Sequence, residues 1–492
     1  MTGRTEPLWV ASAPAPEFPP VEGAVDTEVC VVGAGIVGVT TATELQRAGR
    51  DVVLVDGAKV LQGVTGRTTA KLTVGHGLIY GALISKHGEE VARGYAAANS
   101  AAIEHVLETV EREGIDCDLE RKDNFIYTED TSQVEKLRGE VEAARVAGLA
   151  ASLVADTSLP FEVAGAIRYP DQAQFHPRKY LLARLGTLDR VHEASRVVGV
   201  DVGEPAKVRL RRGVVNARAV VVATHLPIVD RGLFFARAHP TQHVALTAEP
   251  GSTVDGMFIS TEQPPHSVRM AKDADGTDLL LVAGEGGKPG DVPDRMERLR
   301  AWVEERFGTS RVRHRWTAQD YYSVDRRPFV GRSPFARNVY LATGFSGWGM
   351  SGGIAAGLLL ADLVLGKRHP SADVYDPGRI DPAASAKKFA IENTKASAAF
   401  VGDRLRAVRP AENLRPGEAA IVRLGGRRVA AYRSEDGKLS ACSARCTHMG
   451  CLVRWNGEER TWDCPCHGSR YDTEGRVLHG PATRDLERYG RT

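Results

Sequence analysis

Four side chains that commonly bind metal ions occupy two short segments near the C-terminal end of the chain. Cys446 and His448 lie in the first segment, and Cys464 and His467 lie in the second. Two kinds of centre use two cysteines and two histidines: a tetrahedral structural zinc site, and a Rieske [2Fe–2S] cluster, in which two cysteines hold one iron and two histidines the other. Zinc modules usually pair Cys with Cys and His with His along the chain. The mixed pairing found here therefore favours the iron–sulfur cluster, a one-electron redox centre.

A dinucleotide-binding fingerprint lies near the N-terminus. The apolar run 29–32 leads directly into Gly33, Gly35 and Gly38, and a helical stretch and a second apolar run follow, ending at Asp56. In such a βαβ unit the first glycine permits a tight turn, the second allows close approach of a pyrophosphate, and the third allows close helix packing. The phosphates are expected at the N-terminus of the helix, where free N–H groups favour anions. Asp56 is expected to bind ribose hydroxyls.

Further glycine-rich and strand-like segments identify the dinucleotide. A Gly/Thr-rich loop covers 63–70, and a second strand-to-glycine turn covers 339–350. With residues 174–177, 220–224 and 323–331, these segments resemble the D-amino-acid oxidase-like family of FAD oxidoreductases, which includes glycine and sarcosine oxidases. The resemblance covers roughly residues 26–370, and its combination with the C-terminal module resembles a group of bacterial FAD-dependent oxidoreductases with a Rieske domain.

The resemblance implies FAD as the cofactor, held by residues of these segments. The residues expected to bind it are Gly33, Gly35, Ile36, Val37, Gly38, Asp56, Thr65, Gly66, Arg67, Thr68, Thr69, Ala70, Val197, Ala223, Thr224, Gly344, Phe345, Gly347, Trp348, Gly349 and Met350.

Resemblance to high-potential Rieske proteins implies further roles near the cluster. Cysteines at the positions of Cys451 and Cys466 form a disulfide between the ligand loops in those proteins; two reduced thiols are the alternative, which a cytosolic setting favours. Hydroxyls at the positions of Ser469 and Tyr471 hydrogen-bond the sulfurs there and raise the potential of the cluster. His479 is expected to be a surface residue and not a ligand.

The predicted fold is an α/β (α+β) FAD-binding, Rossmann-like domain interleaved with an antiparallel-sheet substrate subdomain, followed by a small all-β Rieske domain. The expected divisions are an N-terminal extension (1–25), the flavoprotein domain (26–375, its substrate subdomain including about 240–325), a helical linker (376–408) and the Rieske domain (409–492).

Composition excludes several classes of protein. The 492 residues include 64 Lys and Arg against 62 Asp and Glu, so no strong positive field points to nucleic acid. The N-terminus has no signal-peptide pattern, and the most apolar stretch, 354–365, is shorter than the ~20 residues that span a bilayer. We expect a cytoplasmic protein without a transmembrane segment. Cys30 and Cys117 are expected to be packing residues.

Both centres together predict an oxidoreductase. FAD accepts two electrons from an organic donor, and a [2Fe–2S] cluster accepts them one at a time, so we expect a dehydrogenase that passes electrons through the cluster to an external one-electron acceptor. Family resemblance suggests an amine or amino acid as the small-molecule substrate. Electron flow in the opposite direction, from a one-electron donor to a substrate, and a redox sensor remain the alternatives.

Candidate substrate-site residues are few. A substrate carboxylate would favour a bidentate arginine, and Arg326, Arg327 and Arg269 are the candidates. Tyr322 lies beside the first two. Lys71 is a departure from the family pattern, and it is expected either to tune the flavin or to pair with a phosphate or carboxylate.

Overall fold

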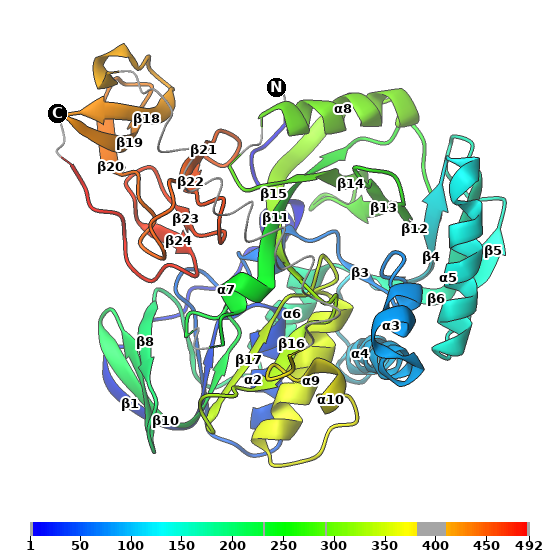
Figure 1. Cartoon of the computed structure of the whole chain (residues 1–492), viewed down its shortest axis with the longest axis horizontal. Helices are drawn as coiled ribbons and strands as arrows, with labels where there is room; N and C mark the ends of the chain where they lie inside the picture. The colour runs from blue at the N-terminus through cyan, green and yellow to red at the C-terminus, as the bar shows by residue number, and fades with distance from the viewer. Residues whose placement is uncertain (1–2, 230–231, 291–292, 381–409, 490–492) are drawn as a thin grey trace.

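The computed structural model describes residues 3–229, 232–290, 293–380 and 410–489. The helical linker expected over 376–408 lies almost wholly outside the described residues. Two large sheets form the body of the molecule, and two small sheets form a C-terminal unit beside it (Figure 1).

The first large sheet has eight strands and a mostly parallel centre. Its order is β16 (Phe329–Arg332), β17 (Val339–Thr343), β10 (Gly213–Val222), β1 (Gly23–Val32), β2 (Val52–Val55) and β7 (Val191–His192), with β9 (Ala206–Leu210) pairing β10 and β8 (Val197–Asp201) pairing β9. β1 runs parallel to both β10 and β2. All four residues of β2 and the last four of β1 are buried, as expected for a parallel sheet covered on both faces.

Two helices pack against each other beside this sheet, α2 (Ile36–Arg47) and α9 (Ser351–Val364). Glycines make the close approach possible. A Cβ atom on Gly353 would lie 2.7 Å from the Ile36 side chain, and one on Gly357 would lie 2.6 Å from Thr40. The apolar stretch 354–365 is therefore the buried helix α9, and no helix in the described part of the chain is long and apolar enough to cross a membrane.

The second large sheet has nine strands and is mostly antiparallel. Its order is β15 (Val312–Ser323), β11 (Ala238–Ala248), β14 (Asp278–Gly287), β13 (Ser267–Lys272), β12 (Met257–Ser260), β4 (Glu120–Thr128), β6 (Gly165–Gln174) and β3 (Lys71–Leu72), with β5 (Ser152–Val154) on β6. Residues 240–325 thus supply most of one half of this sheet, and strands before residue 175 supply the other. The two sheets are interleaved along the chain, as predicted.

The remaining helices surround these sheets. They are α1 (Leu8–Ser12), α3 (Tyr80–His87), α4 (Glu89–Glu113), α5 (Val134–Val146), α6 (Pro177–Leu185), α7 (Phe234–Arg237), α8 (Pro293–Phe307) and α10 (Ala372–Tyr375), with 3-10 turns η1 (Val64–Arg67), η2 (Thr131–Gln133) and η3 (Ala411–Asn413). Pro177 stands at the first position of α6, where its missing N–H costs nothing, and His176 caps that helix by accepting from the Lys179 N–H. α1 belongs to the expected N-terminal extension, yet Leu8 and Trp9 are buried in the main core.

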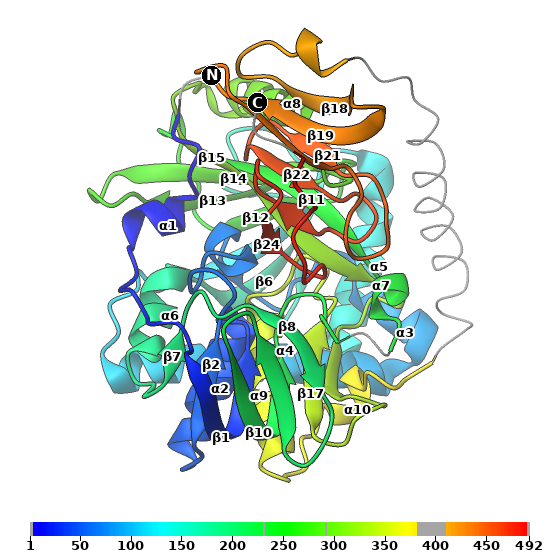
Figure 2. The same cartoon turned by 90° about the vertical axis from the view of Figure 1, so that its left-hand side faces the viewer.

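The C-terminal unit contains a three-stranded sheet, β18 (Ala419–Leu424), β19 (Arg427–Arg433) and β20 (Leu439–Ser443). Its second sheet has four short strands, β21 (Arg454–Asn456), β22 (Thr461–Asp463), β23 (Arg470–Tyr471) and β24 (Val477–His479). This all-β unit lies beside β11 and β15 in both views (Figures 1 and 2). A hydrogen bond from Gln242 Nε2 of β11 to Asp463 Oδ2 of β22, 2.9 Å long, joins the two parts.

Candidate functional site: a cavity shared by two redox modules

The turn between β1 and α2 requires glycine at two of its three glycine positions, Gly33 and Gly38. Gly33 has φ +106°, and a Cβ atom there would lie 2.5 Å from the carbonyl oxygen of Ala223. A Cβ atom on Gly38 would lie 1.9 Å from the Gly33 carbonyl oxygen, which no side chain can tolerate. Gly35 is the residue before α2, and the next N–H, that of Ile36, donates to Thr65 Oγ1 over 3.0 Å. The turn therefore leaves the N-terminus of α2 open to an anion.

Asp56 directly follows β2 and hydrogen-bonds the backbone of this turn. Its Oδ2 accepts from the Ala34 N–H (2.9 Å) and its Oδ1 accepts from the Ala58 N–H (2.8 Å). Burial raises the pKa of Asp56, and the two backbone N–H groups and Arg196 oppose that rise. The carboxylate lies where a ribose of a bound dinucleotide is expected, and it also fixes the loop after β2.

A single cavity of about 880 Å³ begins at this turn. Cofactor and substrate pockets commonly have volumes of ~300–1,000 Å³. Most of the predicted FAD-binding residues line it: Gly33, Gly35, Ile36, Val37, Asp56, Thr65, Arg67, Thr68, Thr69, Val197, Ala223, Thr224, Phe345, Gly347, Trp348, Gly349 and Met350. The glycine-lined turn and the volume of the cavity both suit FAD.

Four of the predicted FAD-binding residues do not line the cavity but belong to the turns and loops that form its wall. Gly38 packs against the Gly33 carbonyl oxygen as described above, and a Cβ atom on Gly66 would lie 2.4 Å from the Leu61 carbonyl oxygen. Ala70 and Gly344 both have positive φ values, 55° and 81°, at the ends of their loops.

Three polar residues that line the cavity have pKa values lowered by burial. His76 stacks on Trp348 with ring centroids 4.7 Å apart, and burial lowers the pKa of His76 to about 3. His243 Nε2 lies 3.1 Å from the Tyr322 hydroxyl, and burial lowers the pKa of His243 to about 4. Lys71 donates from Nζ to the Phe258 carbonyl, and burial, together with nearby Arg269, lowers the pKa of Lys71 well below its ordinary value. Lys71 and Tyr322 of the predicted substrate residues thus line the cavity.

The three candidate arginines have different environments. Arg326 is exposed, lines the cavity and donates to the Leu78 carbonyl over 3.2 Å. Arg327 is not among the cavity-lining residues, and its buried guanidinium pairs with Asp325 at 3.3 Å. Arg269 donates to three backbone carbonyls, including that of Thr69, so its guanidinium supports the flavin loop and does not line the cavity.

The predicted cluster ligands lie together in the C-terminal unit. The Cys464 thiol hydrogen-bonds Cys446, which lowers the pKa of Cys446 to about 6 and favours its thiolate. The rings of His448 and His467 are 5.0 Å apart. In the described part of the chain the buried Nδ1 of His448 has no hydrogen-bond partner, as expected of an atom that binds iron. This donor set fits a [2Fe–2S] cluster.

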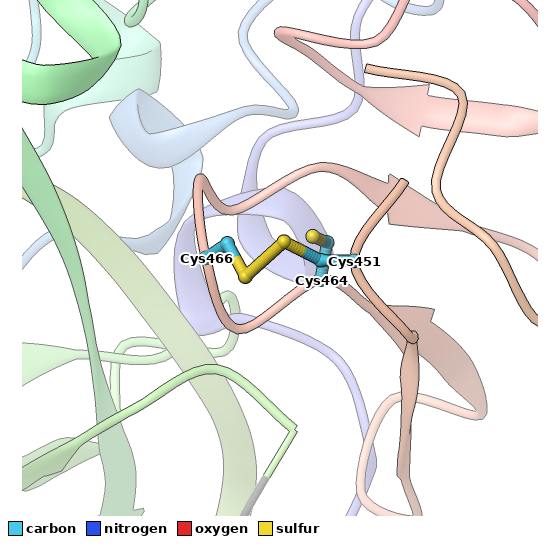
Figure 3. Close-up of side chains that lie close together, drawn as sticks. All are labelled: Cys451, Cys464 and Cys466. Carbon is cyan, nitrogen blue, oxygen red and sulfur yellow. A yellow bond between two sulfur atoms is a disulfide. The ribbon is translucent and has the colours of Figure 1, made fainter. Parts of the chain in front are cut away.

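A disulfide joins Cys451 and Cys466, the pairing that the resemblance implies. The Cys464 sulfur lies within 4.8 Å of both of their sulfur atoms (Figure 3). Only Cys464 of these three keeps a thiol for a metal, so the disulfide ties the two ligand loops together without competing for iron.

The two predicted tuning hydroxyls lie next to the ligands. The Tyr471 hydroxyl is 3.1 Å from the Cys446 sulfur. Ser469 is fully buried; its Oγ accepts from the Ala482 N–H at 3.0 Å, which leaves its proton available to Cys446.

The ligand histidines face the flavoprotein part across a close contact. Phe235 packs edge-on against His467 and His448, with ring centroids 5.3 and 5.9 Å apart. The Tyr321 hydroxyl donates to the His467 carbonyl over 2.8 Å, and Gln319 donates to the Gly468 carbonyl over 3.1 Å. The structure therefore describes the Rieske unit in a docked position.

The docked unit completes the cavity. Glu459, Thr461, Arg470, Leu478, His479, Gly480, Ala482 and Thr483 line it from the Rieske side. His479 is half-buried here and contacts His225, so it is not the surface side chain expected from the sequence. His225, Asp320 and Glu459 were also missed by sequence reasoning, because their local sequence carries no motif and their role depends on the docking of two distant segments.

Comparison with known proteins agrees with both halves of this description. Residues 28–363 match the FAD dependent oxidoreductase family, and residues 405–490 match the Rieske [2Fe-2S] domain family. The Rieske 2Fe-2S iron-sulfur protein YhfW of Bacillus subtilis (strain 168) is 34% identical over 98% of this chain and 97% of its own length. The gamma-glutamylputrescine oxidoreductase of Escherichia coli (strain K12) is 26% identical over 74% of this chain and 90% of its own length.

A solved structure shows the same fold for the larger part. The L-proline dehydrogenase from P. horikoshii superposes with a TM-score of 0.60 at 19% identity, covering 72% of this chain and 97% of that protein. The chain thus belongs to the FAD dependent oxidoreductase family, and it carries a Rieske [2Fe–2S] domain at its C-terminal end.

Proposed function

We propose that this protein is a dehydrogenase of a small amine or amino acid that delivers electrons, one at a time, through its Rieske domain to an external acceptor. The observation that carries the proposal is the shared cavity: the same 880 Å³ space is lined by the dinucleotide turn at one side and by Rieske residues at the other. FAD supplies two-electron oxidation of the donor, and the cluster supplies one-electron transfer.

Amino compounds are proposed as donors on two grounds. Two of the proteins similar to this chain are named for amino compounds, gamma-glutamylputrescine and L-proline. The chain itself offers matching groups: Arg326 at the exposed side of the cavity for a carboxylate, and buried Lys71 for a proton. Because the lowered pKa of Lys71 favours its neutral amine, Nζ can accept a proton from a substrate ammonium and so prepare the amine for oxidation.

An anaerobic screen tests the proposal. Purified holoprotein is mixed with a panel of primary amines, secondary amines and amino acids, while flavin absorbance and the electron paramagnetic resonance signal of the reduced cluster are followed. We expect one class of donor to bleach the flavin first and to produce the cluster signal afterwards. A cluster that is reduced before the flavin would support the reverse direction, and a panel without any effect would favour a redox sensor.

A cluster-free variant separates dehydrogenase from oxidase behaviour. Cys464→Ser removes one iron ligand and leaves the flavin part unchanged. With the donor from the screen, we expect the variant to release more hydrogen peroxide in air than the wild type, because it has lost the internal outlet for electrons. Equally fast peroxide release by both proteins would contradict the proposed role of the cluster.

A further inference from the structure

Two histidines meet across the boundary between the flavoprotein part and the Rieske domain. His225 follows β10 and has φ +68°, and its carbonyl accepts from Thr343 Oγ1 over 2.6 Å. Its Nδ1 lies 3.2 Å from Nε2 of His479, at the end of β24. The ring of His225 packs edge-on against Tyr321, with ring centroids 4.6 Å apart, and this contact limits its rotation. A hydrogen bond between two imidazoles therefore joins the domains.

The carboxylate of Asp320 connects His225 to the glycine loop on the flavin side. The other nitrogen of His225, Nε2, lies 3.1 Å from Asp320 Oδ1. Asp320 Oδ2 accepts from the N–H of Gly347, in the glycine loop that precedes α9. Asp320, His225 and His479 all line the cavity. The three side chains form one hydrogen-bonded row from the flavin loop to the Rieske domain.

Transfer of electrons to the cluster leaves protons behind. An amine that is oxidised to an imine loses two electrons and two protons, and the cluster accepts only the electrons, one at a time, so one proton must leave for each electron. The cavity histidines His76 and His243 hydrogen-bond Tyr95 and Tyr322, which both belong to the flavoprotein part. Among the described cavity residues, the row that begins at Asp320 leads from the flavin loop to the Rieske side.

We propose that Asp320, His225 and His479 form a proton relay that carries the proton of the oxidised donor out along the Rieske side while electrons enter the cluster. The inference rests on the proposed function, because it assumes electron flow from flavin to cluster. The relay residues differ from the contact of Tyr321 with the His467 carbonyl, which brings the cluster ligands close to the flavin part.

Each step of the relay is a proton transfer in which no electron moves. A proton on Asp320 Oδ1 passes to His225 Nε2 as the Nδ1 proton of His225 passes to His479 Nε2. His479 then releases its Nδ1 proton to water, and tautomer exchange of both His225 and His479 restores the starting state. The step requires that, when Asp320 is protonated, His225 carries its own proton on Nδ1, so that Asp320 donates to Nε2 and the Nδ1–H donates to His479.

Charges around His479 favour release of the proton. Burial lowers the pKa of His479 well below its ordinary value, and His225, Arg470, Arg196 and Arg67 lower it further. Arg196 also donates to the Leu478 carbonyl, which holds β24 in place. The one carboxylate among the groups named in the row is Asp320. A proton that reaches His479 is therefore passed on and not retained.

Pulse reduction of the holoprotein tests the relay without a known substrate. A photoexcited deazaflavin delivers single electrons, and the redistribution of electrons between flavin and cluster is followed by absorbance, in H2O and in D2O, across the neutral pH range. A pH-indicator dye in unbuffered solution records proton release in the same samples. We expect the wild type to show a solvent isotope effect and proton release in step with electron redistribution.

The variants His479→Gln and His225→Gln distinguish a proton relay from a hydrogen bond that only holds the two domains together. Glutamine keeps a hydrogen-bonding side chain at the domain boundary but cannot pass a proton on. We expect both variants to slow redistribution at least about tenfold and to lose the solvent isotope effect, with the cluster potential unchanged. His225→Gln lies in the flavoprotein part, so it keeps the test valid if His479→Gln fails to load its cluster.

A matched control removes another contact between the two parts. Arg211 pairs with Asp485 across the boundary, and both side chains are more than a third exposed. Arg211→Gln is expected to keep wild-type redistribution and isotope effect. Glutamine variants of His225 and His479 that behave like this control would overturn the relay and leave the proposed function standing. A wild type without any electron redistribution would overturn the proposed function, and the relay with it.

Discussion

Replacement of Glu459 by glutamine should separate the Rieske domain from the flavoprotein part. Glu459 lies between β21 and β22, and its Oε1 accepts from three donors of the other part. Arg67 Nη1 is 2.6 Å away, the Thr317 N–H 2.7 Å and the Thr317 hydroxyl 3.1 Å. The Glu459 side chain is only 10% exposed, so solvent screens these contacts weakly.

The pKa of Glu459 gives the size of the effect. Burial alone would raise this pKa, but Arg67, Arg470 and the hydrogen bond from the Thr317 N–H lower it from 4.5 to about 2. One pKa unit corresponds to 1.36 kcal/mol, so the interactions of the ionised carboxylate are worth about 3 kcal/mol. Because the pKa is lower in the folded protein, this stabilisation is complete above pH 4.5 and is lost as the pH falls towards about 2.

Urea unfolding of the holoprotein measures the change. Flavin fluorescence reports the larger part and visible circular dichroism reports the cluster. At neutral pH we expect Glu459→Gln to lower the free energy of the transition that releases the Rieske domain by at most about 3 kcal/mol, because Arg470, one cause of the low pKa, belongs to the Rieske domain itself. The difference from the wild type should shrink below pH 4.5.

A surface glutamate provides the control. Glu297 pairs with Arg300 one helical turn away on α8, and the Glu297 side chain is 53% exposed. Glu297→Gln is expected to unfold at the same urea concentration as the wild type, because solvent screens its pair with Arg300. The reasoning fails if Glu459→Gln unfolds at the same urea concentration as Glu297→Gln, or if its difference from the wild type persists unchanged in acid.

Three further changes have defined outcomes. Ser469→Ala removes a hydroxyl next to the cluster ligands; a charge-assisted hydrogen bond of about 1.5–3 kcal/mol corresponds to a one-electron potential lower by about 60–120 mV, measured by redox titration, and an unchanged potential would exclude the tuning role. Gly38→Ala places a Cβ atom 1.9 Å from a backbone oxygen, so it should yield protein that retains the cluster but lacks FAD, whereas Gly139→Ala in α5, with no atom within 4 Å and outside the cavity lining, should bind FAD normally. Cys451→Ser removes the disulfide, whose cysteines are 15 residues apart in the sequence. The free energy of the transition that releases the cluster should fall by about 3 kcal/mol at most, so the cluster should be lost at a lower urea concentration. Equal midpoints in the variant and the wild type would show that the ligand loops keep their positions without the disulfide.

Local sequence was sufficient for the parts of the site that depend on local geometry. The turn at Gly33 and Gly38 needs residues without a Cβ atom, and this requirement is visible in the glycine spacing itself. The paired cysteines and histidines were likewise visible as a set of ligand types. Helix α4 is also bounded by local signals, because Gly88 and Gly114 on either side of it both have positive φ values.

Side-chain partners far apart in the sequence could not be predicted in this way. Arg327 was a reasonable candidate for a carboxylate ligand until the structure paired it with Asp325, on whose other side Arg379 lies at 2.7 Å. His479, beside the segment 480–482, was expected to be a surface residue and not a ligand. Its partner His225 is 254 residues away, so only the docking of the two parts reveals the contact.

The docked contact also makes FAD binding and domain docking depend on each other. Arg67 belongs to the loop predicted to bind FAD and lines the cavity, and the same guanidinium holds Glu459 of the Rieske domain. Trp316 of β15 donates from its indole N–H to the Arg67 carbonyl, which ties this loop to the sheet that the Rieske domain contacts. A cofactor that orders the loop must therefore favour docking, and by reciprocity docking must favour the cofactor by the same factor. The docked state is therefore most stable when both FAD and the cluster are bound, and that is the state in which electrons can pass from the flavin to the cluster.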